Sequence, residues 1–367
     1  MSLLPTIECD KSRPGSDAGG LDRRPLCLRA SIAVDLKPGQ AQERRPVELR
    51  CLWFGARSGP TVIVQGGISA GRDVCASPAH TDPGWWQELV GPGKAVDTSE
   101  VRILAIDWLD AESLGVDCVT TEDQADALAA LLDALQLRSV AAFVGGSYGA
   151  MVGLAFAARH GERLDRLVAI AGAHRPHPLA SAQRAVQRGI LQLGIDSGRE
   201  AEGVSLARQL ALTTYRGSAE LAERFAGPAR QQDGRWQLPV EAWLEHHGDK
   251  FARRCSAQRY LSLSRSIDLH RVDPATVRVP VNLIGIASDR LVPLADLCEL
   301  QRALGGHASL DVVDSRCGHD GFLLEHAQLT PLLGELLRQP PLARRPPDAV
   351  TRTRPCEFPP LPFARSA

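Results

Sequence analysis

The sequence has neither an excess of charge of one sign nor a long apolar run. Its 42 Lys and Arg residues nearly balance 43 Asp and Glu residues, which leaves a formal net charge of -1. Without a basic excess, nothing indicates binding to nucleic acid or to an anionic membrane. No apolar run approaches the roughly 20 residues of a membrane span, and the first residues lack the apolar stretch of a secretory signal. We therefore expect a cytoplasmic protein that contacts no membrane.

Cysteine motifs are missing as well. The nine cysteines are odd in number and widely scattered, and no CxxC pair occurs among them. A disulfide framework or a zinc site would need paired or closely spaced cysteines. We expect reduced thiols and no bound metal.

Both ends of the chain have a composition that resists a packed core. Residues 1–25 are polar and rich in Gly, Pro and Asp, and residues 338–367 are dense in Pro and Arg. Such segments bury too little apolar surface to offset the entropy lost on ordering. We predict a disordered N-terminal segment over 1–25 and a disordered tail over 338–367.

Between these ends, short β-branched runs alternate with helical patterns. Several of the runs are almost continuously apolar, as in strands buried on both faces of a parallel sheet. Strands are predicted at 47–55, 61–67, 101–109, 140–146, 166–172, 279–286 and 309–314. Helices are predicted at 121–137, with Thr120 or Thr121 as N-cap, and at 149–161, 294–304 and 322–339. This alternation predicts a doubly wound, mostly parallel α/β sheet.

The alternation stops between residues 174 and 275. That stretch carries helical patterns only, for example in PLASAQRAVQRGILQLG and EGVSLARQLALTTY. A helical block inserted between two core strands is typical of a lid over an active site. We therefore predict a core over 26–173 and 276–337 and a helical lid over 174–275.

The stretch VAAFVGGSYGAMVGLAFAARHG places Ser147 between Gly145 and Gly149. A predicted strand precedes the serine and a predicted helix follows it. Glycines allow the sharp strand-to-helix turn of a nucleophile elbow, which exposes the hydroxyl at the helix start. The motif GxSxG alone is weak, and an ordinary β-turn-α joint would also explain it.

A nucleophilic serine needs a base and a group that orients the base. Asp289 follows the predicted strand at 279–286, and His319 lies after the strand at 309–314. The chain order Ser, Asp, His is that of the α/β-hydrolase fold, so we predict a triad of these three residues. Asp289 could instead cap the helix at 294, and His319 could be an ordinary loop histidine.

The same chemistry needs two backbone N–H donors for the oxyanion. One is expected at Tyr148, directly after the serine, and the other at Ile68 in the loop VQGGISAG. The glycines of that loop could merely end a strand.

Taken together, GGSYGAM, SDRLVP, GHDGFLLE and the helical block resemble the homoserine O-acyltransferases of the α/β-hydrolase superfamily. GWWQELVGPGKAVDT (84–98) matches a characteristic early segment of that family, and ordinary hydrolases lack it. ARQLALTTY (207–215) and EAWLEHHGDKFARRCSAQRYLSLSRSIDLH (241–270) match as well. The resemblance extends from about residue 60 to 335.

The resemblance also implies a site for the amino-acid substrate. Arg208 matches the arginine that binds the substrate carboxylate, a task for which a guanidinium is suited because it binds bidentately. Tyr215, seven residues further along the same helical face, matches a substrate-site tyrosine. Asp320 matches the carboxylate that binds the substrate ammonium. A solvated Arg208 and an Asp320 that only caps the helix at 322 are the alternatives.

The activity implied is transfer of an acyl group from acyl-CoA to the hydroxyl of L-homoserine, by a ping-pong mechanism in methionine biosynthesis. Acyl-CoA is then a co-substrate, no cofactor is held permanently, and the enzyme is a homodimer. Acetyl is the first expectation for the acyl group and succinyl the second. The segments GGSYGAMVGLAFA and QGGISAG depart from the usual family pattern near the acyl pocket, so L-serine acylation in cysteine biosynthesis stays open. An esterase or thioesterase on the same fold is the other alternative.

Overall fold

The computed structural model describes residues 6–9, 26–35, 44–56, 58–76, 82–109, 111–232 and 234–345. Nine strands form one sheet with the order β1-β2-β3-β7-β4-β8-β9-β12-β13. The strands are β1 (Thr6–Cys9), β2 (Leu26–Asp35), β3 (Arg44–Gly55), β4 (Thr61–Gln65), β7 (Arg102–Ile106), β8 (Ala142–Gly146), β9 (Leu167–Ile170), β12 (Val281–Ile286) and β13 (Ala308–Val313). The six strands from β7 to β13 in this order pair in parallel, whereas β1, β2 and β3 pair antiparallel at one edge. The predicted α/β class is confirmed.

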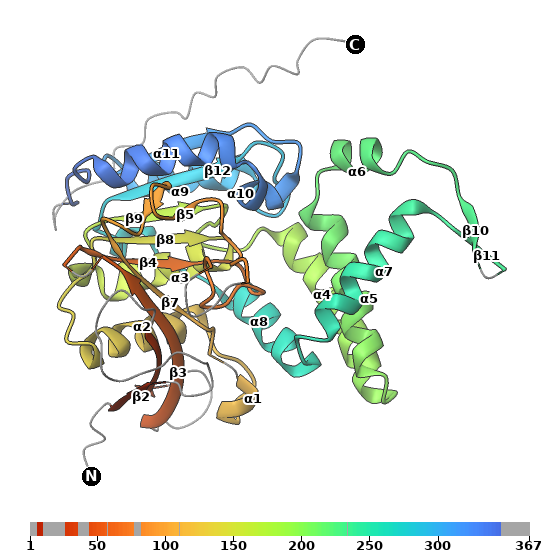
Figure 1. Cartoon of the computed structure of the whole chain (residues 1–367), viewed down its shortest axis with the longest axis horizontal. Helices are drawn as coiled ribbons and strands as arrows, with labels where there is room; N and C mark the ends of the chain where they lie inside the picture. The colour runs from red at the N-terminus through yellow and green to blue at the C-terminus, as the bar shows by residue number, and fades with distance from the viewer. Residues whose placement is uncertain are drawn as a thin grey trace.

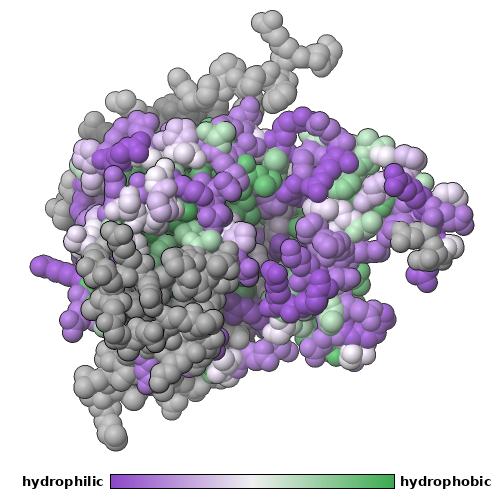
Figure 2. All heavy atoms as spheres, in the orientation of Figure 1, coloured by the Kyte–Doolittle hydropathy of each residue, from purple (hydrophilic) through white to green (hydrophobic). Residues whose placement is uncertain are grey.

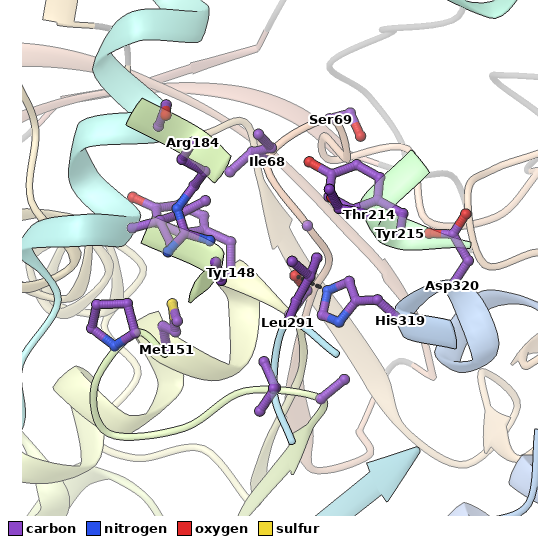
Figure 3. A pocket seen from close by; sticks show the side chains of 18 of the residues that line it. Ile68, Ser69, Tyr148, Met151, Arg184, Thr214, Tyr215, Leu291, His319 and Asp320 are labelled. Carbon is purple, nitrogen blue, oxygen red and sulfur yellow. Dashed lines mark hydrogen bonds between the residues drawn. The ribbon is translucent and has the colours of Figure 1, made fainter. Parts of the chain in front are cut away.

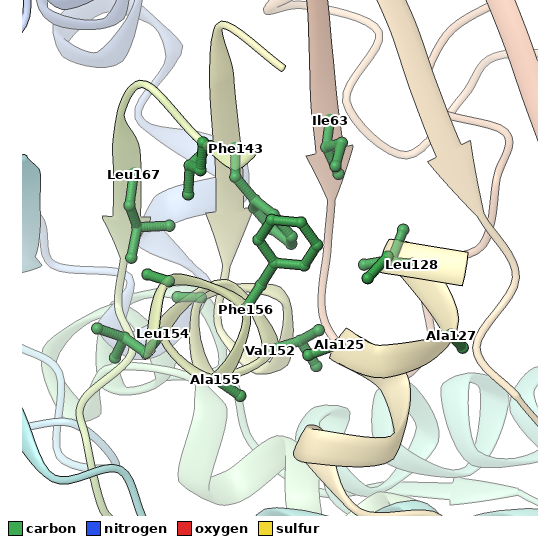
Figure 4. Close-up of a cluster of buried hydrophobic side chains, with 14 of the residues drawn as sticks. Ile63, Ala125, Ala127, Leu128, Phe143, Val152, Leu154, Ala155, Phe156 and Leu167 are labelled. Carbon is green, nitrogen blue, oxygen red and sulfur yellow. The ribbon is translucent and has the colours of Figure 1, made fainter. Parts of the chain in front are cut away.

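The central strands are mostly apolar, in keeping with the helices and loops that cover both faces of the sheet. Every residue of β4, β8, β9 and β12 is buried. On one face, α2 (Thr121–Ala134) and α3 (Tyr148–Arg159) pack Leu128, Val152 and Phe156 against Ile63 and Phe143 (Figure 4). Thr120 is the N-cap of α2, and its side chain accepts a hydrogen bond from the N–H of Asp123 in a capping box.

The other face of the sheet is covered by α11 (His326–Arg338) and by the segment around the short strands β5 (Val90–Gly91) and β6 (Val96–Asp97). Trp86 and Leu89 are fully buried there beside Leu329 and Leu333. The indole N–H of Trp86 donates to the carbonyl of Phe322 at 3.1 Å. This bond joins the GWW segment to the chain just after His319.

The lid projects from the sheet to one side (Figure 1). It consists of five helices, namely α4 (Pro178–Asp196), α5 (Glu200–Tyr215), α6 (Ser218–Arg224), α7 (Pro239–Ala252) and α8 (Ala257–Leu269). A small core of its own, including Leu191, Val204 and Tyr260, holds the helices together. The lid surface seen in Figure 2 is mostly hydrophilic.

Three expectations need correction. The lid contains a two-stranded hairpin, β10 (Arg230–Gln232) and β11 (Arg235–Gln237), whose Gly234 has a φ of 76°. The predicted helix at 322–339 is two helices, α10 (Gly321–Leu324) and α11, and Glu325 between them leaves helical geometry with a ψ of 52°. Thr6–Cys9, within the predicted disordered segment, form β1 because they pair with β2.

The predicted tail begins with ordered residues. Arg345 donates its backbone N–H to the carbonyl of Arg278, and the guanidinium of Arg344 donates to the carbonyls of Gly161 and Leu164. These hydrogen bonds attach the first residues of the predicted tail to the core. Residues 1–5, 10–25 and 346–367 lie outside the described residues. Among the helices that are described, none combines the length and apolarity needed to cross a bilayer.

Candidate active site

Ser147 lies at the turn between β8 and α3, at the N-cap position of the helix. Its φ of 55° and ψ of -116° are rarely adopted by a residue with a side chain. The turn is possible because the chain passes very close to its neighbours. A Cβ on Gly145 would lie 2.4 Å from the carbonyl oxygen of Gly149, and one on Gly149 would lie 2.3 Å from that of Gln65. The glycines of the motif are therefore required by backbone contacts.

Asp289 and His319 reach Ser147 from two loops that follow β12 and β13. The Nε2 atom of His319 lies 2.8 Å from Ser147 Oγ, and its Nδ1 lies 2.6 Å from Asp289 Oδ2. With Nδ1–H donating to the carboxylate, Nε2 is free to accept the serine proton. Side-chain exposure is only 7% for His319 and 0% for Asp289, so water competes little for these bonds. The three residues have the geometry that a nucleophilic triad requires.

The remaining oxygen of Asp289 is also bonded. Asp289 Oδ1 accepts from the backbone N–H of Leu291 at 2.8 Å and of Val292 at 3.0 Å. These bonds hold the carboxylate in the orientation that His319 needs. Pro293, not Asp289, is the N-cap of α9 (Leu294–Leu304), so the helix-capping alternative does not apply.

Two opposing influences act on the pKa of His319. Burial lowers the pKa because it disfavours the imidazolium, whereas the charge and hydrogen bond of Asp289 raise it. Asp320 adds to the upward shift and Arg184 opposes it, and the pKa moves upward overall. The imidazolium that would form during proton transfer is therefore stabilised by the site.

The loop after β4 passes beside the serine. A Cβ on Gly67 would lie 3.9 Å from Ser147 Oγ, and Ile68 lines the same cavity. Two bonds to the Gly67 carbonyl, from Ala70 N–H at 2.9 Å and from Trp108 Nε1 at 3.0 Å, hold the loop in place. Tyr148 begins α3, where backbone N–H groups have no acceptor within the helix. Both predicted oxyanion donors thus belong to segments that border Ser147.

Ser147 and His319 open into a cavity of about 200 Å³ between core and lid. The core supplies Ile68, Met151 and Leu291, and the lid supplies residues of α4, α5 and α8. Figure 3 shows Tyr215 and Asp320 on one side of His319, and Arg184 with Tyr148 and Met151 on the other. The cavity therefore has two ends, and His319 lies between them.

Arg208 and Tyr215, both on α5, border this cavity. The guanidinium carbon of Arg208 lies 5.2 Å from the ring centre of Tyr215 and 4.7 Å from that of Phe251. No carboxylate in the described part of the chain forms an ion pair with Arg208. A cation held by aromatic rings and lacking an acidic partner can bind a substrate carboxylate.

Asp320 borders the cavity next to His319. Its Oδ2 lies 3.4 Å from a guanidinium nitrogen of Arg216, which also binds Glu220. The Asp320 side chain makes no capping bond to α10, so the capping alternative is not realised. Sequence reasoning missed Arg216 because its partner is 104 residues away along the chain.

Sequence reasoning also missed Arg184 on α4, at the other end of the cavity. The surrounding sequence, SAQRAVQRG, is that of an ordinary polar helix surface and gives no signal of a site. As for metals, the residue ranges that the structure describes contain no group of three His, Cys, Asp or Glu side chains that could hold an ion.

The fold and the Ser147–His319–Asp289 geometry are those of the α/β-hydrolase fold class. A family model described as "alpha/beta hydrolase fold" matches residues 60–326. Within that class, the chain belongs to the homoserine O-acyltransferases. It is 43% identical, over 92% of its length and 91% of the relative's, to a homoserine O-succinyltransferase of Xanthomonas campestris pv. campestris.

A homoserine O-acetyltransferase of Leifsonia xyli subsp. xyli is 36% identical to this chain, and the match covers 68% of this chain and 73% of the relative. The crystal structure of homoserine O-acetyltransferase from Bacillus anthracis superposes with a TM-score of 0.76 at 14% identity, covering 88% of this chain and all of that one. At this identity the superposition shows the fold alone. The chain is an acyltransferase, and its relatives support homoserine O-acylation.

Proposed function

We propose that the protein transfers a short acyl group from acyl-CoA to the hydroxyl of L-homoserine by a double displacement. The observation that supports this most is the pairing of an activated serine with two oppositely charged groups in one cavity. Arg208 suits the carboxylate of an amino acid and Asp320 suits its ammonium group. A hydrolase has no need for such a pair.

In the first half of the reaction, Ser147 Oγ attacks the thioester carbonyl while His319 Nε2 takes the serine proton. The N–H groups of Ile68 and Tyr148 stabilise the oxyanion. The C–S bond breaks, the thiolate takes the proton from His319, and CoA leaves. Asp289 stabilises the imidazolium through the short bond to Nδ1.

In the second half, the hydroxyl of homoserine attacks the acyl-enzyme. His319 takes the hydroxyl proton, the ester bond to Ser147 breaks, and the proton passes to the serine oxygen. Transfer exceeds hydrolysis because the lid keeps water away and the acceptor is held in position. Arg208, Tyr215 and Asp320 supply that hold.

The proposal also covers the oligomeric state, cellular location and pathway of the enzyme. The family resemblance supports a homodimer in the cytoplasm that acts in methionine biosynthesis with no permanently bound cofactor. L-serine, one methylene shorter, is the rival acceptor, and pockets discriminate one methylene by only about 10- to 200-fold.

A matrix of donors and acceptors tests this function. Acetyl-CoA and succinyl-CoA are each combined with L-homoserine and L-serine, and free CoA and O-acylated product are both measured. We expect one equivalent of product per CoA with homoserine and a smaller kcat/KM with serine. CoA release without any O-acylated product would instead identify a thioesterase, and a higher kcat/KM with serine would reassign the acceptor.

Ser147→Ala serves as the negative variant and should lower CoA release by at least about 10⁴-fold. Cys317→Ala is the matched control, because this thiol is the nucleophile nearest to His319 along the chain. Burial raises the pKa of Cys317, so it is a poor thiolate, and its loss should leave CoA release intact. A CoA burst retained in Ser147→Ala would rule out the proposed nucleophile.

A further inference from the structure

The end of the cavity opposite Asp320 carries a cation that is not fully neutralised by the ion pairs of the described residues. Asp268 on α8 binds two arginines of α4 at once. Its Oδ1 lies 2.6 Å from Arg184 and its Oδ2 lies 2.6 Å from Arg188. One carboxylate thus faces two guanidinium groups, so one positive charge remains. The exposed fractions of these side chains are 13%, 22% and 16% for Arg184, Arg188 and Asp268, so solvent screens that charge only weakly.

Of the two arginines, Arg184 borders the cavity. Its Nε donates to Asp268 at 2.8 Å and its Nη2 to Ser181 at 3.2 Å, whereas Nη1 has no hydrogen-bond partner within the described ranges. The bonds to Asp268 and Ser181 hold the guanidinium in place beside the cavity that Arg184 lines. An arginine fixed in this way is ready to bind a carboxylate without a further loss of side-chain entropy.

Besides Asp320, the acidic side chain that lines the cavity is Asp296, and its charge is shared with other cations. Asp296 borders the cavity, and its charge interacts electrostatically with His174 and Arg175. Arg175 is in turn bound to Glu299 at 2.6 Å. The negative charges near Arg175 therefore belong to a separate cluster and do not balance Arg184.

Figure 3 shows Arg184 on one side of His319 and Asp320 with Tyr215 on the other. The guanidinium carbon of Arg208 lies 5.2 Å from the ring centre of Tyr215. If Arg208 and Asp320 hold the acceptor, the acyl group on Ser147 extends toward Tyr148, Met151 and Arg184. An acetyl group would end among the apolar side chains and leave the guanidinium unbound. A four-carbon acyl group that ends in a carboxylate would bring an anion toward it.

We propose that Arg184 binds the distal carboxylate of a dicarboxylic acyl group, so that the preferred donor is a CoA thioester of the succinyl type. The inference rests on the proposed acyl transfer and specifies its donor. Arg188 is a positioning residue, because it shares Asp268 with Arg184 without bordering the cavity.

The test measures the first half-reaction alone, so that the identity of the acceptor does not matter. The full chain is mixed with succinyl-CoA or acetyl-CoA, no amino acid is added, and the rate of the CoA burst gives an acylation efficiency for each donor. We expect the wild type to favour succinyl-CoA. In Arg184→Gln, the ratio of succinyl to acetyl efficiency should fall roughly 10- to 100-fold.

Arg175→Gln is the matched control, because it also removes a cation from the cavity wall. Its ratio should stay within about twofold of the wild type. An equal fall in Arg175→Gln, or an unchanged ratio in Arg184→Gln, would overturn the assignment. Should Arg184→Gln fail to fold, Arg184→Lys decides: it keeps the charge but not the fork, so the ratio should fall several-fold, and no change refutes the role.

The same experiment separates failure of this inference from failure of the proposed function. A burst with acetyl-CoA and none with succinyl-CoA would overturn the role of Arg184 and leave acyl transfer standing. No burst with either thioester would contradict the acyl-CoA mechanism itself.

Discussion

At the scale of single residues, the protonation of His319 should set the response to pH. Only neutral His319 can accept the proton of Ser147. Asp289 stabilises the charged form, and the pKa of His319 lies above its ordinary value of 6.5 despite burial. The efficiency of acylation should therefore rise with pH until that raised pKa is passed. A pH profile of kcat/KM for the acyl donor between pH 5 and 9 measures this rising limb, whose midpoint gives the pKa of His319.

Asp289→Asn checks the cause of the shift. The variant removes the charge that raises the pKa of His319 but keeps the burial that lowers it, so the limb should move to lower pH. The rate should also fall by about 10⁴-fold, as when the orienting carboxylate of such a triad is lost. Asp165→Asn, on the exposed surface beside Arg344, is the control and should alter neither property. A limb that stays in place in Asp289→Asn would contradict the electrostatic explanation.

Substitution of Arg208 distinguishes acyl transfer to an amino acid from simple hydrolysis. Arg208→Ala should raise the apparent KM for the amino acid by at least about 30-fold, because removal of one partner from a buried charged pair costs several kcal/mol. The CoA burst should persist, and hydrolysis of the acyl-enzyme should take a larger share of turnover. The measurement is CoA released against product formed across an acceptor titration, with exposed Arg253→Ala as control. If Arg208→Ala blocks the burst and leaves the acceptor KM unchanged, Arg208 serves the acyl donor.

At the scale of elements, two glycines in helices give opposite predictions. In Gly149→Ala, the new methyl would meet the backbone carbonyl of Gln65 at 2.3 Å, so the elbow must shift. We expect a loss of about 1–3 kcal/mol in the free energy of unfolding, together with loss of acylation. Gly189 lies on the exposed face of α4 and a methyl there meets nothing within 4 Å, so Gly189→Ala should stabilise by about 0.5–1 kcal/mol. Urea unfolding of both variants measures the difference, and equal effects would contradict the steric argument.

Elements with one strong local signal were predictable from sequence. The strand before Ser147, the N-cap Thr120 and the helix at 294–304 follow from apolar runs, capping chemistry and helical periodicity. The hairpin in the lid was missed, although Asp233-Gly234 is a known hairpin signal, because the helical patterns on both sides dominated the interpretation. The break at Glu325 was missed because the apolar spacing continues across it.

The site was predictable only in part, for a physical reason. Ser147, Asp289 and His319 follow strands of one parallel sheet, whose carboxyl ends meet at one edge, so sequence order alone indicates that they converge. Arg184 lies on the lid, and its relation to the serine depends on how α4 packs on α8. The bonds to Asp268 that define this packing join residues 80 or more positions apart, beyond the reach of any local pattern.

At the scale of the whole molecule, core and lid together line one cavity, which serves both half-reactions in the proposed mechanism. The core supplies Ser147 and His319, whereas the lid supplies Arg184 on α4 and Arg208 on α5. Neither part alone could both activate the serine and hold two anionic groups. In the proposed mechanism, the lid also separates the acyl-enzyme from bulk water. Transfer, as distinct from hydrolysis, would then be a property of the assembled molecule.

This arrangement predicts the form of the steady-state kinetics. With one nucleophile between two binding ends, the acyl group must leave CoA before the acceptor hydroxyl can take its place at Ser147. Double-reciprocal plots against the acyl donor at several fixed concentrations of homoserine should therefore give parallel lines. Exchange of labelled CoA into the acyl donor in the absence of homoserine should proceed and should vanish in Ser147→Ala. Intersecting lines, together with no such exchange, would require both substrates to be bound at once and would contradict the double displacement.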